Sequence, residues 1–220
     1  MGRGVLITSS GTGITYNNCE NVLLTGIVQV NTPEHGWSGN LIHSRDLKII
    51  NFKELGGKDY STDGTNLTNS SNVLFENCVW CCDDDCIAIK GNTRDLPDDT
   101  INIKNCIMYS SNGGCITIGT ETIVQRISNL TMSDCDLYFD DRFGNSVTGE
   151  TAKGPINIAS RYATFIRNLT YDNIDIWTNM LAGAAPAGVT VAPGPLACLA
   201  LALSLFYIGG MYLNDAFDRE

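Results

Sequence analysis

Four aspartates in the first half of the chain have the residue type and spacing for acid–base chemistry. Asp83, Asp84 and Asp85 are consecutive in the segment "CCDDDCIAIKG", and Asp63 in "STDG" precedes Asp84 by 21 residues. If the fold repeats with a coil of about this length, residues so spaced lie on adjacent coils about 4.8 Å apart. We therefore expect Asp63, Asp84 and Asp85 to converge on one groove.

Convergence of carboxylates has a chemical consequence. Three crowded carboxylates cannot all ionise easily, so at least one pKa is expected to rise and leave that carboxyl protonated. One protonated and one ionised carboxyl are what hydrolysis of a glycosidic bond requires. The alternatives are a solvated Asp-rich turn and a calcium site built from oxygen ligands.

The elements that position these aspartates are predicted from an internal repeat. Six segments share an initial Asn, Asp or Thr, an alternation of apolar and other residues with period two, and usually a final Asn or Asp. Successive segments start 25, 26, 28, 29 and 39 residues apart. Short strands at this interval, with Asn-rich corners, predict the coils of a right-handed parallel β-helix. The segments are "NVLLTG" at Asn21, "DLKIIN" at Asp46, "NVLFEN" at Asn72, "TINIKN" at Thr100, "NLTMSD" at Asn129 and "NLTYDN" at Asn168.

The cysteines are interpreted within the same repeat. Cys78, Cys106 and Cys135 each follow the final Asn or Asp of a segment, so we expect them to stack as a ladder of buried thiols that act as small hydrophobic residues. The alternative is a zinc cluster formed by the four closely spaced cysteines. No second CxxC or HxxxH half follows at a ligand spacing, which argues against zinc. Those four cysteines are Cys78, Cys81, Cys82 and Cys86.

Composition and charge limit the class of partner. The chain has 220 residues and a net charge of −10, which argues against nucleic acid or an anionic membrane surface as the main partner. The opening "MGRGVLITSSGTG" has no apolar signal-peptide region and already alternates as a strand does. If the parent protein is secreted, we therefore expect the start of its chain to be missing here.

Three stretches carry a resemblance to a known family. "NTPEHGW", "STDGTNLTNSSNVLFENC" and "DDDCIAIKG" are similar to the corresponding motifs of the polygalacturonases, glycoside hydrolase family 28, over about residues 5–176. The resemblance implies a right-handed parallel β-helix, a polysaccharide substrate such as pectin, and no cofactor. It also implies that Asp84 is the general acid, while Asp63 and Asp85 activate water with inversion at the anomeric carbon. An extracellular or periplasmic location is implied for the parent hydrolase.

The chain also departs from that family's pattern. Gly114 stands in place of the histidine of the Gly-His-Gly motif, and Asp83 stands where the family usually has glycine. Ile156 and Ile158 occupy the positions of the Arg-x-Lys that binds the substrate carboxylate. We expect Lys90 and Arg161 to contribute to substrate binding instead, and Arg167 is an alternative. The departures leave two interpretations open: a hydrolase for another, neutral glycan, or a glycan-binding β-helix without catalysis.

The last part of the chain differs in kind from the repeat. Residues 195–213 are nineteen residues without a charge, which predicts a membrane-spanning helix, with a helix capping the solenoid as the alternative. The stretch "WTNMLAGA…GGMYLNDAFDRE" resembles the start of UbiA-type prenyltransferases. In that resemblance Asn214, Asp215 and Asp218 would hold Mg²⁺ against a diphosphate. We thus expect two domains, a β-helix at 1–176 and a truncated membrane segment at 177–220, joined near Trp177 as a chimera.

Overall fold

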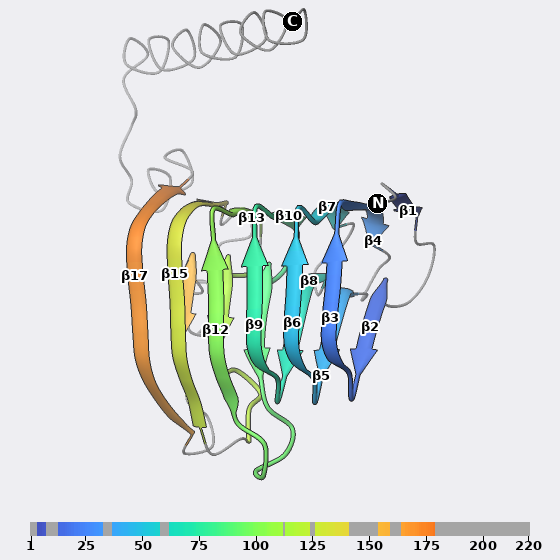
Figure 1. The fold of residues 1–220 in the computed structure, drawn as a ribbon. Helices are drawn as coiled ribbons and strands as arrows, with labels where there is room; N and C mark the ends of the chain where they lie inside the picture. The colour runs from blue at the N-terminus through green and yellow to red at the C-terminus, as the bar shows by residue number, and fades with distance from the viewer. Residues whose placement is uncertain are drawn as a thin grey trace, which may run out of the picture. The chain divides into compact units, whose positions relative to one another are not determined.

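The computed structural model describes residues 4–7, 13–32, 37–57, 62–111, 113–123, 126–140, 154–158 and 164–178, all within one compact unit, Met1–Asn179. Every regular element in these ranges is a β-strand, and every pairing between strands is parallel (Figure 1). The predicted membrane segment 195–213, Arg161 and the residues Asn214, Asp215 and Asp218 lie outside the described residues. Among the described residues, no helix has the length and apolar character needed to span a membrane.

The strands form three faces. The first contains β3 (Glu20–Thr25), β6 (Arg45–Ile50), β9 (Ser71–Glu76), β12 (Asp98–Lys104) and the first parts of β15 (Arg126–Phe139) and β17 (Phe165–Thr178). The second contains β1 (Gly4–Ile7), β4 (Ile27–Thr32), β7 (Lys53–Gly57), β10 (Val79–Cys82), β13 (Ile107–Ser110) and the ends of β15 and β17. The third contains β2 (Ile14–Asn17), β5 (Trp37–Ile42), β8 (Asp63–Thr68), β11 (Ile87–Lys90), β14 (Ile116–Ile118) and β16 (Ile156–Ile158).

The chain visits the three faces in turn, once per coil, and each coil stacks in register on the one before it. On the first face Arg45 pairs with Glu20, 25 residues earlier, and Ser71 pairs with Arg45, 26 residues earlier. Leu130 pairs with Ile101 at an interval of 29. These intervals are those of the sequence repeat, which confirms the prediction of an all-β solenoid of parallel strands, consistent with a right-handed β-helix.

The Asn-rich ends of the repeat segments form the corners between faces. The first and last residue of all six segments has a positive φ, between 50° and 70°. Asn, Asp and Gly tolerate this left-handed conformation best, which explains why they recur at these positions. Side-chain amides also stack between coils, as Asn105 Nδ2 donates to Asn77 Oδ1 at 2.6 Å and Asn173 Nδ2 to Asp134 Oδ1 at 2.8 Å.

The cysteine ladder is confirmed. Cys78, Cys106 and Cys135 occupy equivalent positions on successive coils and are 1%, 1% and 2% exposed. The cysteines in the described residues are free thiols. Within those same residues, no group of three or more metal-ligating side chains contains a cysteine, so the zinc alternative receives no support.

Candidate active site

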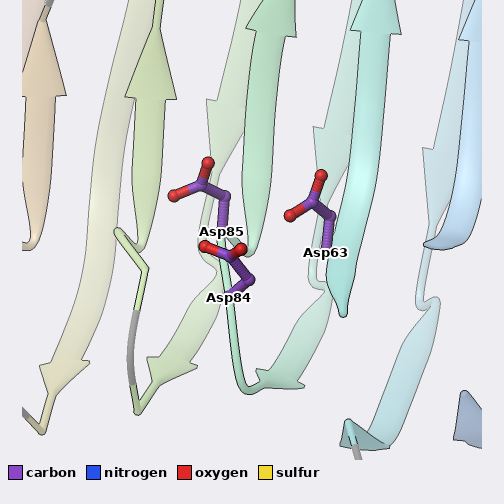
Figure 2. Close-up of side chains that lie close together, drawn as sticks. All are labelled: Asp63, Asp84 and Asp85. Carbon is purple, nitrogen blue, oxygen red and sulfur yellow. The ribbon is translucent and has the colours of Figure 1, made fainter. Parts of the chain in front are cut away.

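Asp63 and Asp85 occupy equivalent positions on neighbouring coils of the third face. Asp63 is the first residue of β8, and Asp85 lies just before β11, whose Ile87 pairs with Thr65. The backbone N–H of Gly64 donates to the carbonyl oxygen of Asp85 at 2.8 Å. Figure 2 shows the two side chains projecting from the same side of the sheet. The stacked pair is therefore Asp63 and Asp85, whereas the sequence interval had matched Asp63 with Asp84.

The structure brings the three predicted carboxylates together. One oxygen each of Asp63, Asp84 and Asp85 can be chosen so that all three lie within 4.8 Å of one another. Asp63 and Asp85 are both 5% exposed, and Asp84 is half-buried beside them. The cluster therefore lies at the surface of the third face with most of its volume withdrawn from water.

The turn that carries Asp84 is fixed by the following coil. Ser110 Oγ donates to the carbonyl oxygen of Asp84 at 2.9 Å and accepts from the N–H of Gly113 at 3.1 Å. A Cβ at Gly113 would lie 2.3 Å from Asp84 Oδ1 and 2.5 Å from the backbone nitrogen of Asp85. Only glycine allows this approach. Asp83 points elsewhere and receives a hydrogen bond from Ser111.

Asp85 is held by two donors from the next coil. Its Oδ1 accepts from the backbone N–H of Gly114 at 2.7 Å and from Thr117 Oγ1 at 2.6 Å. Thr117 Oγ1 in turn accepts from Asn157 Nδ2 at 3.3 Å. Donors aimed at one oxygen stabilise negative charge on it. Sequence reasoning missed Thr117 and Asn157, although both fall on one register row with Asn66 once the strands are aligned.

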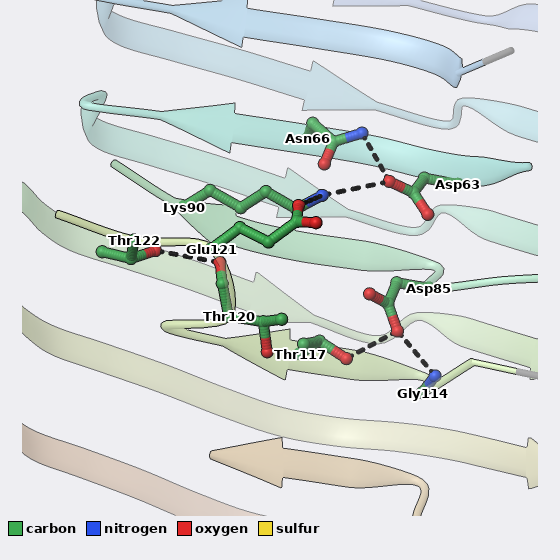
Figure 3. Close-up of polar contacts among 9 residues, drawn as sticks. All are labelled: Asp63, Asn66, Asp85, Lys90, Gly114, Thr117, Thr120, Glu121 and Thr122. Carbon is green, nitrogen blue, oxygen red and sulfur yellow. Dashed lines mark hydrogen bonds and ion pairs between the residues drawn. The ribbon is translucent and has the colours of Figure 1, made fainter. Parts of the chain in front are cut away.

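Asp63 lies between an amide and an ammonium group. Its Oδ2 accepts from Asn66 Nδ2 at 3.0 Å and pairs with Lys90 Nζ at 3.4 Å (Figure 3). Burial raises the pKa of Asp63; the Lys90 charge opposes this, and the nearby Asp84 charge adds to it. The net direction is upward. The crowding predicted from the sequence thus favours a proton in this cluster.

Lys90, which we expected to bind substrate, is occupied within the protein. Its side chain is 20% exposed, and its ammonium also pairs with Glu121 Oε2 at 3.3 Å. Burial alone would lower the pKa of Lys90, but the carboxylates of Asp63, Glu121 and Asp85 outweigh it, so the net direction is upward. This ammonium already supplies positive charge beside Asp63, which disfavours a divalent cation in the same place.

Two departures from the family pattern have a structural explanation. Gly114, at the position of the family histidine, follows Asp63 and Asp85 on the third face, but a Cβ there would lie 2.6 Å from Asn157 Nδ2. On β16, Asn157 is the residue that reaches Thr117, whereas Ile156 packs against the core. The pleat therefore presents an amide, and not the side chain of Ile156, beside the carboxylates.

Comparison with known proteins establishes the family. The family described as Glycosyl hydrolases family 28 matches residues 8–178, and the chain belongs to it. A probable polygalacturonase from Arabidopsis thaliana is 26% identical over 174 residues, which cover 76% of this chain and 34% of that protein.

A solved structure gives a similar coverage. The family 28 exopolygalacturonase of Yersinia enterocolitica is 17% identical with a TM-score of 0.46, covering 74% of this chain and 34% of that one. The chain thus spans about a third of the length of each relative. The family match ends at residue 178, so the UbiA-type resemblance of 177–220 and its Mg²⁺ site stay predictions.

Proposed function

We propose that this chain is a glycoside hydrolase that cleaves a polysaccharide with Asp63, Asp84 and Asp85 as its acid–base groups. The observation that carries the proposal is the approach of the three carboxyl oxygens to within 4.8 Å of one another in a family 28 chain. The raised pKa of Asp63 and the two donors on Asp85 support a cluster that holds both a proton and a negative charge.

The proposed reaction uses these groups in a balanced sequence. Asp84 donates its proton to the glycosidic oxygen as the bond between that oxygen and the anomeric carbon breaks. Asp63 and Asp85 hold a water molecule, which attacks the anomeric carbon and transfers its proton to one of them. The products are two shorter saccharides, and exchange of protons with solvent restores Asp84. No cofactor takes part in this sequence.

We propose inversion at the anomeric carbon, as the family resemblance implies. Carboxyl groups of inverting glycosidases typically lie about 6.5 to 9.5 Å apart. The shorter separation of the nearest oxygens here makes the stereochemistry a separate test. Proton NMR of the first product formed distinguishes the outcomes: inversion is supported if that product has the anomeric configuration opposite to the bond cleaved, and excluded if it has the same configuration.

The substrate class is proposed from the relatives. Polygalacturonate is the first polymer to test, because both named relatives are described as polygalacturonases. Rhamnogalacturonan and dextran are the second and third, since Gly114 and the uncharged β16 depart from the pattern that binds a uronate carboxylate. Release of reducing ends from one of these polymers identifies the class. Binding to one of them without release would favour a glycan-binding β-helix instead.

The double variant Asp84→Asn/Asp85→Asn tests the site. Loss of general acid–base groups typically costs about 10²- to 10⁴-fold in rate, and we expect at least this loss with the fold retained by circular dichroism. Asp83→Asn is the matched control, because Asp83 belongs to the same acidic run but is bonded to Ser111. Hydrolysis that survives the double variant, or a loss equal in the control, would exclude the assignment. Insensitivity to chelators would exclude the calcium alternative.

A further inference from the structure

One ammonium group links the proposed site to a carboxylate outside it. Lys90 Nζ lies 3.4 Å from Asp63 Oδ2 and 3.3 Å from Glu121 Oε2. The side chains of Lys90 and Asp63 are 20% and 6% exposed, whereas that of Glu121 is 66% exposed. The contact with Asp63 is therefore the strongly coupled one, and Glu121 approaches the ammonium from the solvent side.

The backbone around Glu121 is built to keep that carboxylate in place. Glu121 has a φ of 55°, an uncommon conformation for a residue other than glycine, asparagine or aspartate. On both sides the turn is bonded to the end of β11, one residue from Lys90: Gly91 N–H donates to Thr122 Oγ1 at 3.2 Å, and Ile123 N–H donates to the Gly91 carbonyl at 2.8 Å. Backbone strain that the surroundings enforce is a feature of functional positions.

We propose that Glu121 is a positioning residue that holds the Lys90 ammonium beside Asp63, so that the Lys90–Glu121 pair sets the charge on the Asp63 carboxyl. This assigns Lys90 to the control of a reacting group and removes it from the substrate-binding role expected from the sequence. The inference deepens the proposed function and rests on it, because Asp63 is there one of the groups that activate water.

The sign of each effect follows from the charges that face Asp63. These are the ammonium of Lys90 at the end of β11, the carboxylates of Asp84 and Asp85 in the turn before it, and Glu121 behind Lys90. Without the Lys90 charge, the Asp63 carboxylate is less stable and its pKa rises. Without the Glu121 charge, Lys90 is shared with one carboxylate fewer and the pKa of Asp63 falls.

Two variants therefore shift one titration in opposite directions. Lys90→Met is expected to move the carboxyl-carbon NMR titration of Asp63 upward by about 1 to 3 pH units. Glu121→Gln is expected to move it downward by a smaller amount, because Glu121 is exposed and screened. The acidic limb of kcat/KM is expected to move in the same two directions, since Asp63 acts in its ionised form. The Asp63 signal is assigned by its loss in Asp63→Asn.

Two further variants keep the test decisive. Glu20→Gln removes a carboxylate from the Arg45–Glu20 surface pair, at 2.8 Å on the first face, and is expected to leave the Asp63 titration unchanged. Glu121→Gly removes the charge while favouring the positive φ, and must shift the titration as Glu121→Gln does. Unchanged titration in both Glu121 variants, or a shift in the same direction as Lys90→Met, overturns the inference. Absence of hydrolysis in the wild type would instead overturn the proposed function, while the NMR titration still decides this one.

Discussion

Thr117 donates a hydrogen bond to Asp85 across the boundary between two coils. The distance from Thr117 Oγ1 to Asp85 Oδ1 is 2.6 Å, and both residues are almost fully buried. Asn157, one coil further on, donates to the same hydroxyl oxygen at 3.3 Å. The charge on Asp85 is thus supported by a row of side chains from two successive coils, and substitutions along this row test its importance.

Thr117→Val is expected to lower kcat by about 10- to 100-fold with little change in stability. The substitution keeps the shape of the side chain but removes a hydrogen bond to a charged group, worth about 1.5 to 3 kcal/mol. Steady-state kinetics on the substrate identified by the polymer screen measures the effect. Thr117→Ser retains the hydroxyl and is the matched control. Equal losses in both variants would mean that packing at this position matters and the hydrogen bond does not.

Gly114→Ala is expected to reduce the free energy of unfolding by about 1 to 3 kcal/mol, the usual cost of overpacking. The added Cβ would lie 2.6 Å from Asn157 Nδ2 and 2.8 Å from Thr117 Oγ1. Urea denaturation of Gly114→Ala, Asn157→Ala and the double variant measures the coupling, and the double variant should lose less than the sum. Gly154→Ala is the control, because a Cβ there meets nothing within 4 Å. Additive losses would contradict the proposed steric conflict.

Stability is expected to fall as the pH rises above that at which an unfolded thiol ionises, about 8.5. Burial raises the pKa of the Cys86 thiol well above its ordinary value, so the folded chain keeps a proton that the unfolded chain loses. The unfolded state then binds fewer protons, and the free energy of unfolding decreases by up to about 1.4 kcal/mol per pH unit for each such thiol.

Reducing urea titrations between pH 8 and 9.5 measure this slope. Cys86→Ala should make it shallower by the contribution of one thiol. Ile87→Val, at a neighbouring residue that is also fully buried, should lower stability by about 0.5 to 1.5 kcal/mol without changing the slope. A slope that is the same in Cys86→Ala and the wild type would contradict the argument.

The repeat was predictable from sequence because its signals are local. A strand that buries one face alternates with period two, and a left-handed corner selects Asn, Asp or Gly, so both leave a mark on consecutive residues. For the same reason the stacked thiols of Cys78, Cys106 and Cys135 followed from their common place in the segment. The three aspartates were found because their types, run and interval are unusual in combination.

The partners of those aspartates were not predictable in the same way. Asp85 stacks on Asp63, although the interval had favoured Asp84, because the coil at this point is one residue longer than the distance counted along the chain. Lys90 looks free in the sequence, and only the turn that presents Glu121 places a second carboxylate on it.

The sequence by itself determined the coil, its corners and the presence of an acidic cluster, because each depends on residues close together in the chain. The tertiary structure decided which carboxylates stack, which hydroxyl and amide support Asp85, and which charges face Asp63. Those contacts join residues 22 to 40 positions apart through the register of parallel strands, and a shift of one residue in that register turns a side chain to the opposite face.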